Sequence, residues 1–98
     1  MGATTFEICG KGKTAAEAFN ILREEALHRY GHGGYTGSIA EKNKFREVFL
    51  PQAIVSNLKA LNDKVYDLIN TDFDDKYGPA GCIKIKEGEY YFFGWAAE

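Results

Sequence analysis

The sequence has few cysteines, few prolines and no long apolar run. Its 98 residues include two Cys and two Pro, and the formal net charge is −2. Two cysteines cannot build a disulfide scaffold, and no CxxC or CxxH spacing supplies the roughly four ligands of a zinc site. No stretch approaches the ~20 apolar residues of a transmembrane helix, and the N-terminus lacks a signal-peptide pattern. We therefore expect a cytoplasmic protein with no membrane segment, metal or cofactor.

The charge balance also differs from that of a nucleic-acid-binding protein. Such proteins carry a strongly basic surface, because lysine and arginine neutralise phosphates. This chain has 12 basic and 14 acidic residues. Nucleic acid is therefore not expected as a direct ligand.

Aromatic residues are the one class in surplus. The chain contains seven Phe, six Tyr and one Trp, whereas a domain of this size buries only about 60–70% of its unfolded surface. Ordinary apolar and charged fractions of 45% and 27% indicate a single globular domain over residues 1–98. We therefore expect some of the rings to lie on a surface that a partner covers.

Apolar stripes predict two helices. Thr14 and Glu17 fit a capping box, a stripe with helical spacing follows over 15–30, and Gly31 is placed to end that helix. Pro51 precedes a second stripe, which predicts a helix over 52–71. The members of this stripe are Ile54, Leu58, Leu61, Val65, Leu68 and Ile69.

Strands are expected around these helices. They are predicted over 4–9, 38–42, 45–50, 82–86 and 89–96, the last two joined by a turn at Glu87 and Gly88. The resulting order, β-α-β-β-α-β-β, predicts an α+β fold. We expect a mainly antiparallel sheet of about four to five strands with the two helices packed on one face.

The two-residue turn sets an expected register for the C-terminal hairpin. Pairing residue 86 with 89 and 82 with 93 gives one apolar face, the natural core face under the helices, with Ile83, Ile85, Tyr90 and Phe92. The opposite face combines Cys82 with the residues that we select as a partner-binding surface, namely Lys84, Lys86, Tyr91, Phe93 and Trp95.

Three interpretations of that second face stay open. The chain's own loops, including 31–37, would cover it in the simplest case. A protein partner would suit exposed rings with lysines at the rim, and a homodimer formed through this face is one form of that interpretation. Base stacking is the third, but no motif of single-strand-binding sheets accompanies the rings.

Acidic residues gather in a short stretch of the second half. They are Asp63, Asp67, Asp72, Asp74 and Asp75. Clustered carboxylates can compete for a nucleic-acid-binding groove on a partner protein, so we add Asp72, Asp74 and Asp75 to the partner-binding set. A solvated helix end explains the same aspartates more simply.

A glycine-rich loop offers a candidate small-ligand site. Glycines let backbone amides approach a ligand, and the loop also supplies an imidazole, a phenol and a hydroxyl. The segment Gly10–Thr14 resembles the end of a phosphate-binding loop, but Glu7 stands where that motif needs glycine. Its lysines can still hold an anion at the helix start. The candidate ligand-binding residues are His32, Gly33, Gly34, Tyr35, Thr36, Lys11 and Lys13. No catalytic residue is selected.

Two segments resemble parts of small proteins of tailed bacteriophages and prophages. The first is Tyr30-Gly31-His32-Gly33-Gly34-Tyr35-Thr36-Gly37-Ser38-Ile39-Ala40-Glu41-Lys42, and the second is Lys76-Tyr77-Gly78-Pro79-Ala80-Gly81-Cys82-Ile83. The resemblance extends over these two segments and carries no catalytic or binding residue. It implies a context in which small proteins, anti-CRISPR inhibitors among them, act by binding.

The hypothesis from the sequence is therefore a small binding protein without catalysis. It would inhibit a bacterial defence protein by stoichiometric association in the host cytoplasm. The alternative is a small-ligand or nucleotide-binding protein that sequesters or hydrolyses its ligand with the glycine-rich loop 31–37.

Overall fold

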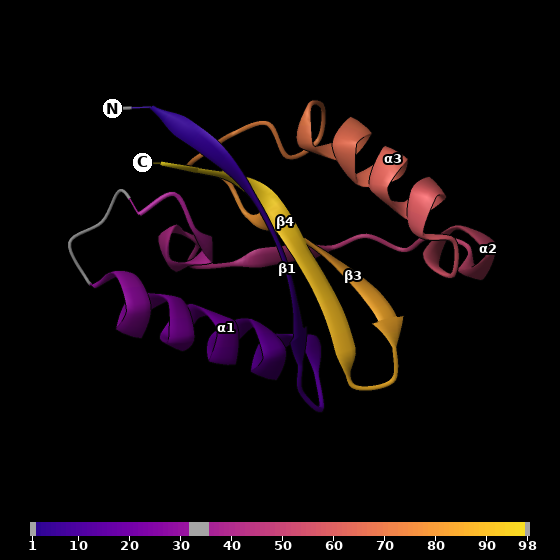
Figure 1. Ribbon diagram of the computed structural model, residues 1–98, viewed down its shortest axis with the longest axis horizontal. Helices are drawn as coiled ribbons and strands as arrows, with labels where there is room; N and C mark the ends of the chain where they lie inside the picture. The colour runs from indigo at the N-terminus through magenta and orange to yellow at the C-terminus, as the bar shows by residue number, and fades with distance from the viewer. Residues whose placement is uncertain (1, 32–35, 98) are drawn as a thin grey trace.

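The computed structural model describes residues 2–31 and 36–97. Its elements, in chain order, are β1 (Ala3–Lys11), α1 (Ala15–Tyr30), the 3-10 turn η1 (Ile39–Glu41), β2 (Phe45–Glu47), α2 (Gln52–Val55), α3 (Leu58–Ile69), β3 (Ala80–Lys86) and β4 (Glu89–Ala97) (Figure 1). Within these described ranges, no helix has the length and apolarity needed to cross a membrane.

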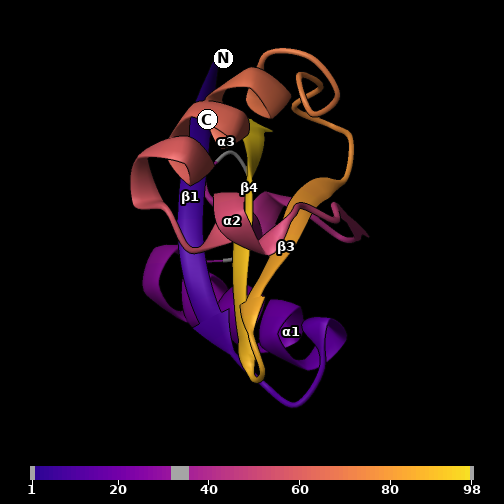
Figure 2. The ribbon, with the colours of Figure 1, turned by 90° about the vertical axis from the view of Figure 1, so that its right-hand side faces the viewer.

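One mixed sheet organises the chain. Its strand order is β1-β4-β3-β2, so that β4 lies between β1 and β3 (Figure 2). The pairs β1/β4 and β3/β4 are antiparallel, and the short strand β2 runs parallel to β3. The predicted α+β class with a mainly antiparallel sheet is confirmed.

The helices cover opposite faces of this sheet, with α1 on one side and α3 on the other (Figure 1). The prediction that both helices pack on one face is therefore wrong. The physical reason lies in β3 and β4, where every residue from Ala80 to Ile83 and from Tyr90 to Phe93 is buried. A strand with apolar side chains on both sides needs a cover on both sides.

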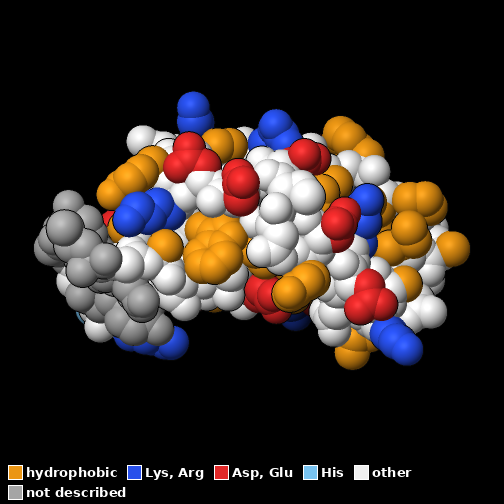
Figure 3. Space-filling model, turned by 90° about the horizontal axis from the view of Figure 1, so that it is seen from above, with side chains coloured by type: hydrophobic (Ala, Val, Ile, Leu, Met, Phe, Trp, Pro, Cys, Tyr) orange, Lys and Arg blue, Asp and Glu red, His pale blue; other side chains and the backbone are white. Residues whose placement is uncertain are grey.

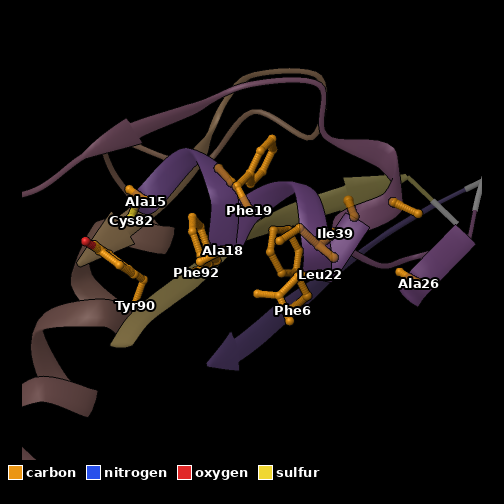
Figure 4. Packing of buried hydrophobic residues seen from close by; sticks show 13 residues of the cluster. Phe6, Ala15, Ala18, Phe19, Leu22, Ala26, Ile39, Cys82, Tyr90 and Phe92 are labelled. Carbon is orange, nitrogen blue, oxygen red and sulfur yellow. The ribbon is translucent and has the colours of Figure 1, made fainter. Parts of the chain in front are cut away.

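The α1 face holds an aromatic cluster. Phe19 of α1 lies with its ring centroid 4.9 Å from that of Phe45 and 5.5 Å from that of Phe92. Leu22 and Ala18 of α1 point toward the sheet beside them, near Phe6 and Phe92 (Figure 4). Offset and tilted rings at these distances add to the stabilisation from burial.

The predicted start and end of α1 are confirmed. The Thr14 hydroxyl accepts a hydrogen bond from the Glu17 amide (3.1 Å), and the Glu17 carboxylate accepts one from the Lys13 amide (3.3 Å). Gly31 follows the helix with φ 88°, a value that glycine adopts without steric cost.

The predicted helix over 52–71 is two helices. The chain leaves α2 at Ser56, and the Asn57 side chain then accepts a hydrogen bond from the Ala60 amide (3.2 Å) and caps α3. Asparagine competes for backbone hydrogen bonds, which favours a cap over a helix interior. Leu58 is consequently the first residue of α3 and is 72% exposed, although the stripe placed it in the core.

The predicted strand over 38–42 is absent. The Ser38 hydroxyl caps the turn η1 by accepting from the Ala40 amide (3.2 Å), and Lys42 ends that turn with its amide bonded to the Ile39 carbonyl. A serine cap favours a helical turn over a strand at this point. The sheet therefore has four strands, and β2 covers only the beginning of the predicted strand over 45–50.

The hairpin register differs from the predicted one by one residue. A bulge between Lys84 and Lys86 places Ile83 opposite Tyr91 and Cys82 opposite Phe92. A bulge adds a residue to one strand and so reverses the facing of every residue before it. Ile83 therefore lies on the α3 side, whereas the predicted register placed it with Tyr90 and Phe92.

Gly81 is required for this packing. It lies opposite Phe93 in the register, and a Cβ atom at Gly81 would overlap the Phe93 ring. That ring is fully buried and meets Phe73 at a centroid distance of 5.2 Å.

We expect Gly81→Ala to destabilise the protein by about 1–3 kcal/mol, because a fully buried ring must move to admit the methyl group. Urea unfolding measures the effect. In a Phe93→Leu background the smaller side chain leaves room, so the same substitution should cost less. Equal costs in the two backgrounds would contradict this packing.

A pH dependence follows from Cys82, which is buried in the α1 face. Burial raises the pKa of its thiol from 9.0 to about 12. The unfolded chain therefore loses this proton near pH 9, whereas the folded chain keeps it. The free energy of unfolding should fall between pH 9 and 12, by up to about 1.4 kcal/mol per pH unit from this group.

Cys82→Ala should reduce this alkaline slope in urea unfolding curves. Cys9→Ala is the matched control and should change the slope less, because Cys9 is exposed. An unchanged slope in Cys82→Ala would show that the thiol does not titrate as described.

Candidate functional site

The three rings selected as a partner surface lie under α3. Phe93 is fully buried, Tyr91 is buried, and both belong to the core beneath this helix. The indole N–H of Trp95 donates to the Ile69 carbonyl at the end of α3 (2.9 Å). The expectation that these rings form a free face is therefore wrong, since α3 covers them. The interpretation in which the chain covers them itself is the correct one, although a helix does so.

Tyr91 is further fixed at its polar end. Its hydroxyl donates to the Glu7 carboxylate (3.2 Å) on the neighbouring strand. Burial and the neighbouring Glu7 charge raise the pKa of Tyr91 above its usual value. A buried phenol whose hydroxyl has a partner is typical of a core residue.

The two hairpin lysines are exposed and paired locally. Lys84 forms an ion pair with Glu87 (2.8 Å), and Lys86 lies 3.5 Å from a carboxylate oxygen of Glu89. The hydrogen bond to Glu87 raises the pKa of Lys84. These side chains flank the turn and do not form a rim around the three rings.

The candidate ligand residues do not come together. His32, Gly33, Gly34 and Tyr35 lie outside the described residues. The Thr36 hydroxyl, which is described, donates to the Glu41 carboxylate (2.8 Å) and lies 2.7 Å from the Ser38 hydroxyl.

The two lysines of the ligand set lie at the far end of β1. Lys11 pairs with Glu89 beside the hairpin turn, whereas Gly37, which follows Thr36, bonds to Ala97 at the opposite end of β4. Nine residues of strand separate these ends by roughly 25 Å. One nucleotide-sized ligand therefore cannot touch both Thr36 and Lys11 or Lys13.

A small cavity lies beside Gly37 and Ser38. A cavity of about 280 Å³ lies between β1 and α1, with Phe6, Ile8, Leu22 and Ala26 as apolar walls. Glu25 and Arg29 also line this cavity, and Gly37, Ser38 and Ile39 form one of its sides. Its volume is at the small end for a ligand pocket.

The five aspartates of the acidic stretch are all exposed. Asp63 and Asp67 lie one turn apart on the outer side of α3, because Leu61, Val65 and Leu68 turn the inner side to the sheet. Asp72 and Asp74 continue the acidic surface into the loop after α3. Figure 3 looks onto this side of the molecule and shows acidic side chains distributed along it, with Lys and Arg side chains between them.

Two exposed tyrosines accompany these aspartates, and the Lys76 ammonium lies 5.2 Å from the centroid of the Tyr77 ring. Tyr66 on α3 and Tyr77 in the following loop are each 73% exposed. The Asp75 carboxylate accepts a hydrogen bond from the Tyr77 amide (2.8 Å), so this aspartate shapes the loop and also contributes charge. We call Asp63, Tyr66, Asp67, Asp72, Asp74 and Tyr77 the acidic face.

Sequence reasoning missed the residue that holds the acidic loop in place. Lys42 is only 2% exposed, and its ammonium donates to the carbonyls of Gly78 (2.8 Å), Lys76 (3.2 Å) and Asp75 (3.4 Å). Desolvation lowers the pKa of this ammonium group. A single lysine in a polar segment carries no sequence signal for burial, because lysine is almost never buried unless it is paired.

An apolar patch was also missed. Phe49 is 86% exposed and Leu58 is 72% exposed, on either side of α2. Hydrophobic side chains gather at the end of the molecule where α2 lies (Figure 3). Phe49 falls in the predicted strand over 45–50, whose second half does not form.

Comparisons with known proteins give no relative. A scan against protein-family models, a search of curated proteins and a search of solved structures each returned no match. Over residues 2–31 and 36–97, no group of three or more His, Cys, Asp or Glu side chains is placed to hold a metal ion.

We expect Lys42→Met to destabilise the protein by about 2–4 kcal/mol, because three carbonyls lose a charged donor. Lys44→Met is the matched control at an exposed lysine two residues away and should change stability by less than about 0.5 kcal/mol. Thermal and urea unfolding measure both. Equal stability of the two variants would contradict the role assigned to the Lys42 ammonium.

Proposed function

We propose that this chain is a small binding protein that inhibits a bacterial defence protein by stoichiometric contact, in the context of a bacteriophage. The observation that carries the proposal is the acidic face, in which four exposed carboxylates and two exposed tyrosine rings lie along α3 and its following loop. The resemblance of two segments to small phage proteins supplies the context.

The chemistry of this face suits a basic partner. Asp63 and Asp67 lie about 5–6 Å apart at their Cβ atoms, as neighbours one helical turn apart do. Exposed carboxylates attract the lysine and arginine side chains with which a defence nuclease or sensor holds nucleic acid. The proposed inhibitor therefore competes with nucleic acid for a basic groove.

The tyrosines supply the remaining contact energy. Exposed ion pairs contribute little on their own, whereas tyrosine is enriched among the residues that dominate binding energy at interfaces. Tyr66 follows Asp63 by three residues on α3, so these two side chains are neighbours on the helix surface.

The face is also held in shape before binding. The inner side of α3 packs through Val65, Leu68 and Ile69, and the loop after α3 is bound by the Lys42 ammonium. Preorganisation lowers the entropy cost of association. A rigid acidic surface on a domain of this size is consistent with inhibition by occlusion.

The test replaces the charges without changing shape. A variant with Asp63→Asn, Asp67→Asn, Asp72→Asn and Asp74→Asn is used as bait in a bacterial lysate, beside the unchanged chain. We expect the unchanged chain to enrich basic nucleic-acid-binding proteins and the variant to lose that enrichment by at least tenfold. Excess duplex DNA or RNA should displace what the unchanged chain captures.

The matched control removes carboxylates elsewhere. The control variant, Glu24→Gln with Glu47→Gln, changes two exposed carboxylates outside the acidic face. It is compared with a variant that changes two carboxylates of the acidic face, Asp63→Asn with Asp67→Asn. Capture should survive the first change and weaken in the second. Equal capture by all variants, or no enrichment by the unchanged chain, would contradict the proposal.

A further inference from the structure

The two edges of the sheet differ in length and protection. The edge strand β2 has three residues, whereas the edge strand β1 has nine. Among the backbone groups of the described residues, no hydrogen bond reaches the outer side of β1. A long open edge is a template for another strand.

The pairing with β4 shows which β1 residues face outward. The Gly12 amide donates a hydrogen bond to the Gly88 carbonyl (3.1 Å). In an antiparallel pair every second residue bonds to the same neighbouring strand, and the register extends this pattern from Gly12 back along β1. Residues with even numbers therefore direct their backbone groups to β4. The backbone N–H and C=O groups of Ala3, Thr5, Glu7, Cys9 and Lys11 point away from the sheet.

We propose that β1 of a second copy of this chain occupies this edge. The two β1 strands run antiparallel about a two-fold axis that passes beside Cys9. Glu7 then lies opposite Lys11 of the second copy, and Lys11 lies opposite its Glu7. The result is a continuous eight-stranded sheet.

Charge complementarity selects this register. An axis at Glu7 would place two carboxylates opposite each other, and an axis at Ile8 would place Glu7 opposite Cys9. Only the axis at Cys9 pairs each Glu7 with a Lys11. Opposite charges that face each other across neighbouring strands are favourable, whereas like charges are unfavourable.

The other face of the pairing is apolar. Ile8 lies on the α1 side of β1 and is 37% exposed, and in this register it is the diagonal neighbour of Ile8 of the second copy. Each Ile8 also lies opposite Gly10 of the second copy, beneath which the Leu22 side chain packs. The pairing therefore buries an isoleucine that the single chain leaves partly exposed.

The dimer joins two acidic faces. A two-fold axis perpendicular to the sheet keeps α3 of both copies on the same side. This inference does not depend on the proposed function, because strand pairing at β1 does not involve the acidic face. If both hold, one dimer presents two acidic faces to a partner.

The test measures mass against concentration. Five paired residues per copy bury less than the ~1,200 Å² of a standard stable interface, so we expect a dissociation constant of about 10–100 μM. Sedimentation equilibrium over about 10 μM to 1 mM should show reversible dimerisation. Glu7→Lys should weaken it at least tenfold, and Glu7→Lys with Lys11→Glu should restore it.

Lys11→Glu is the second single variant, because Glu7→Lys also removes the hydrogen bond from Tyr91. It places two carboxylates opposite each other and should also weaken the dimer. A chain that stays monomeric at the highest concentration, a dimer that both single variants leave intact, or a double variant that stays monomeric would each overturn the proposal.

Oxidation tests the register. Diamide takes two electrons and two protons from a pair of thiols and leaves a disulfide. The axis at Cys9 places the two Cys9 Cα atoms about 5.5 Å apart, within disulfide range, whereas the axis at Ile8 places them diagonally at about 7–8 Å. We expect a cross-linked dimer in Cys82→Ala and none in Cys9→Ser. No cross-link under conditions where the dimer forms would overturn this register.

Discussion

The structure depends on one strand that is buried on both sides. Phe92 and Phe93 are neighbours in β4, both fully buried, and their side chains enter opposite cores. Side chains alternate along a strand, so two adjacent rings require a cover on each face of the sheet. The helices α1 and α3 provide these covers, and most of the aromatic residues of the chain pack between these helices and the sheet. Gly81 makes room for one ring, while Phe19 and Phe45 surround the other.

This two-sided core decides which surfaces remain for function. The hairpin rings are inside, so a partner can meet only what the covers leave outside. The outer side of α3 carries two carboxylates and Tyr66, and the open edge of β1 carries backbone groups that face away from the sheet. The buried Lys42 ammonium links the inside to the outside, because it gathers the carbonyls of the loop that continues the acidic face. The proposed inhibitor contact and the proposed strand pairing therefore use separate parts of one scaffold.

Local signals in the sequence were sufficient for local structure. The Thr14 cap, Gly31, Gly88 and the stripe of α1 predicted one helix and one hairpin turn correctly, because each rests on interactions within a few residues. The placement of α3 on the second face, the bulge at Lys84–Lys86 and the burial of Lys42 depend on contacts between distant segments. A register prediction that assumes no bulge assigns every preceding side chain to the wrong face. The acidic stretch was found from the sequence. Tyr91, Phe93 and Trp95 were assigned to the surface because the sequence does not show that α3 packs over them.

Amide hydrogen exchange of the free chain, followed residue by residue by NMR, tests the two-sided core most directly. Groups in the centre of a cooperative core open only with global unfolding, whereas those at an open edge exchange readily. We expect the amides of Tyr91, Phe92 and Phe93 and the indole N–H of Trp95 to exchange among the slowest in the chain. The outward amides of Thr5, Glu7 and Cys9 should exchange far faster at low protein concentration. Fast exchange along β4, comparable to that of these β1 amides, would contradict a core that covers β4 on both sides.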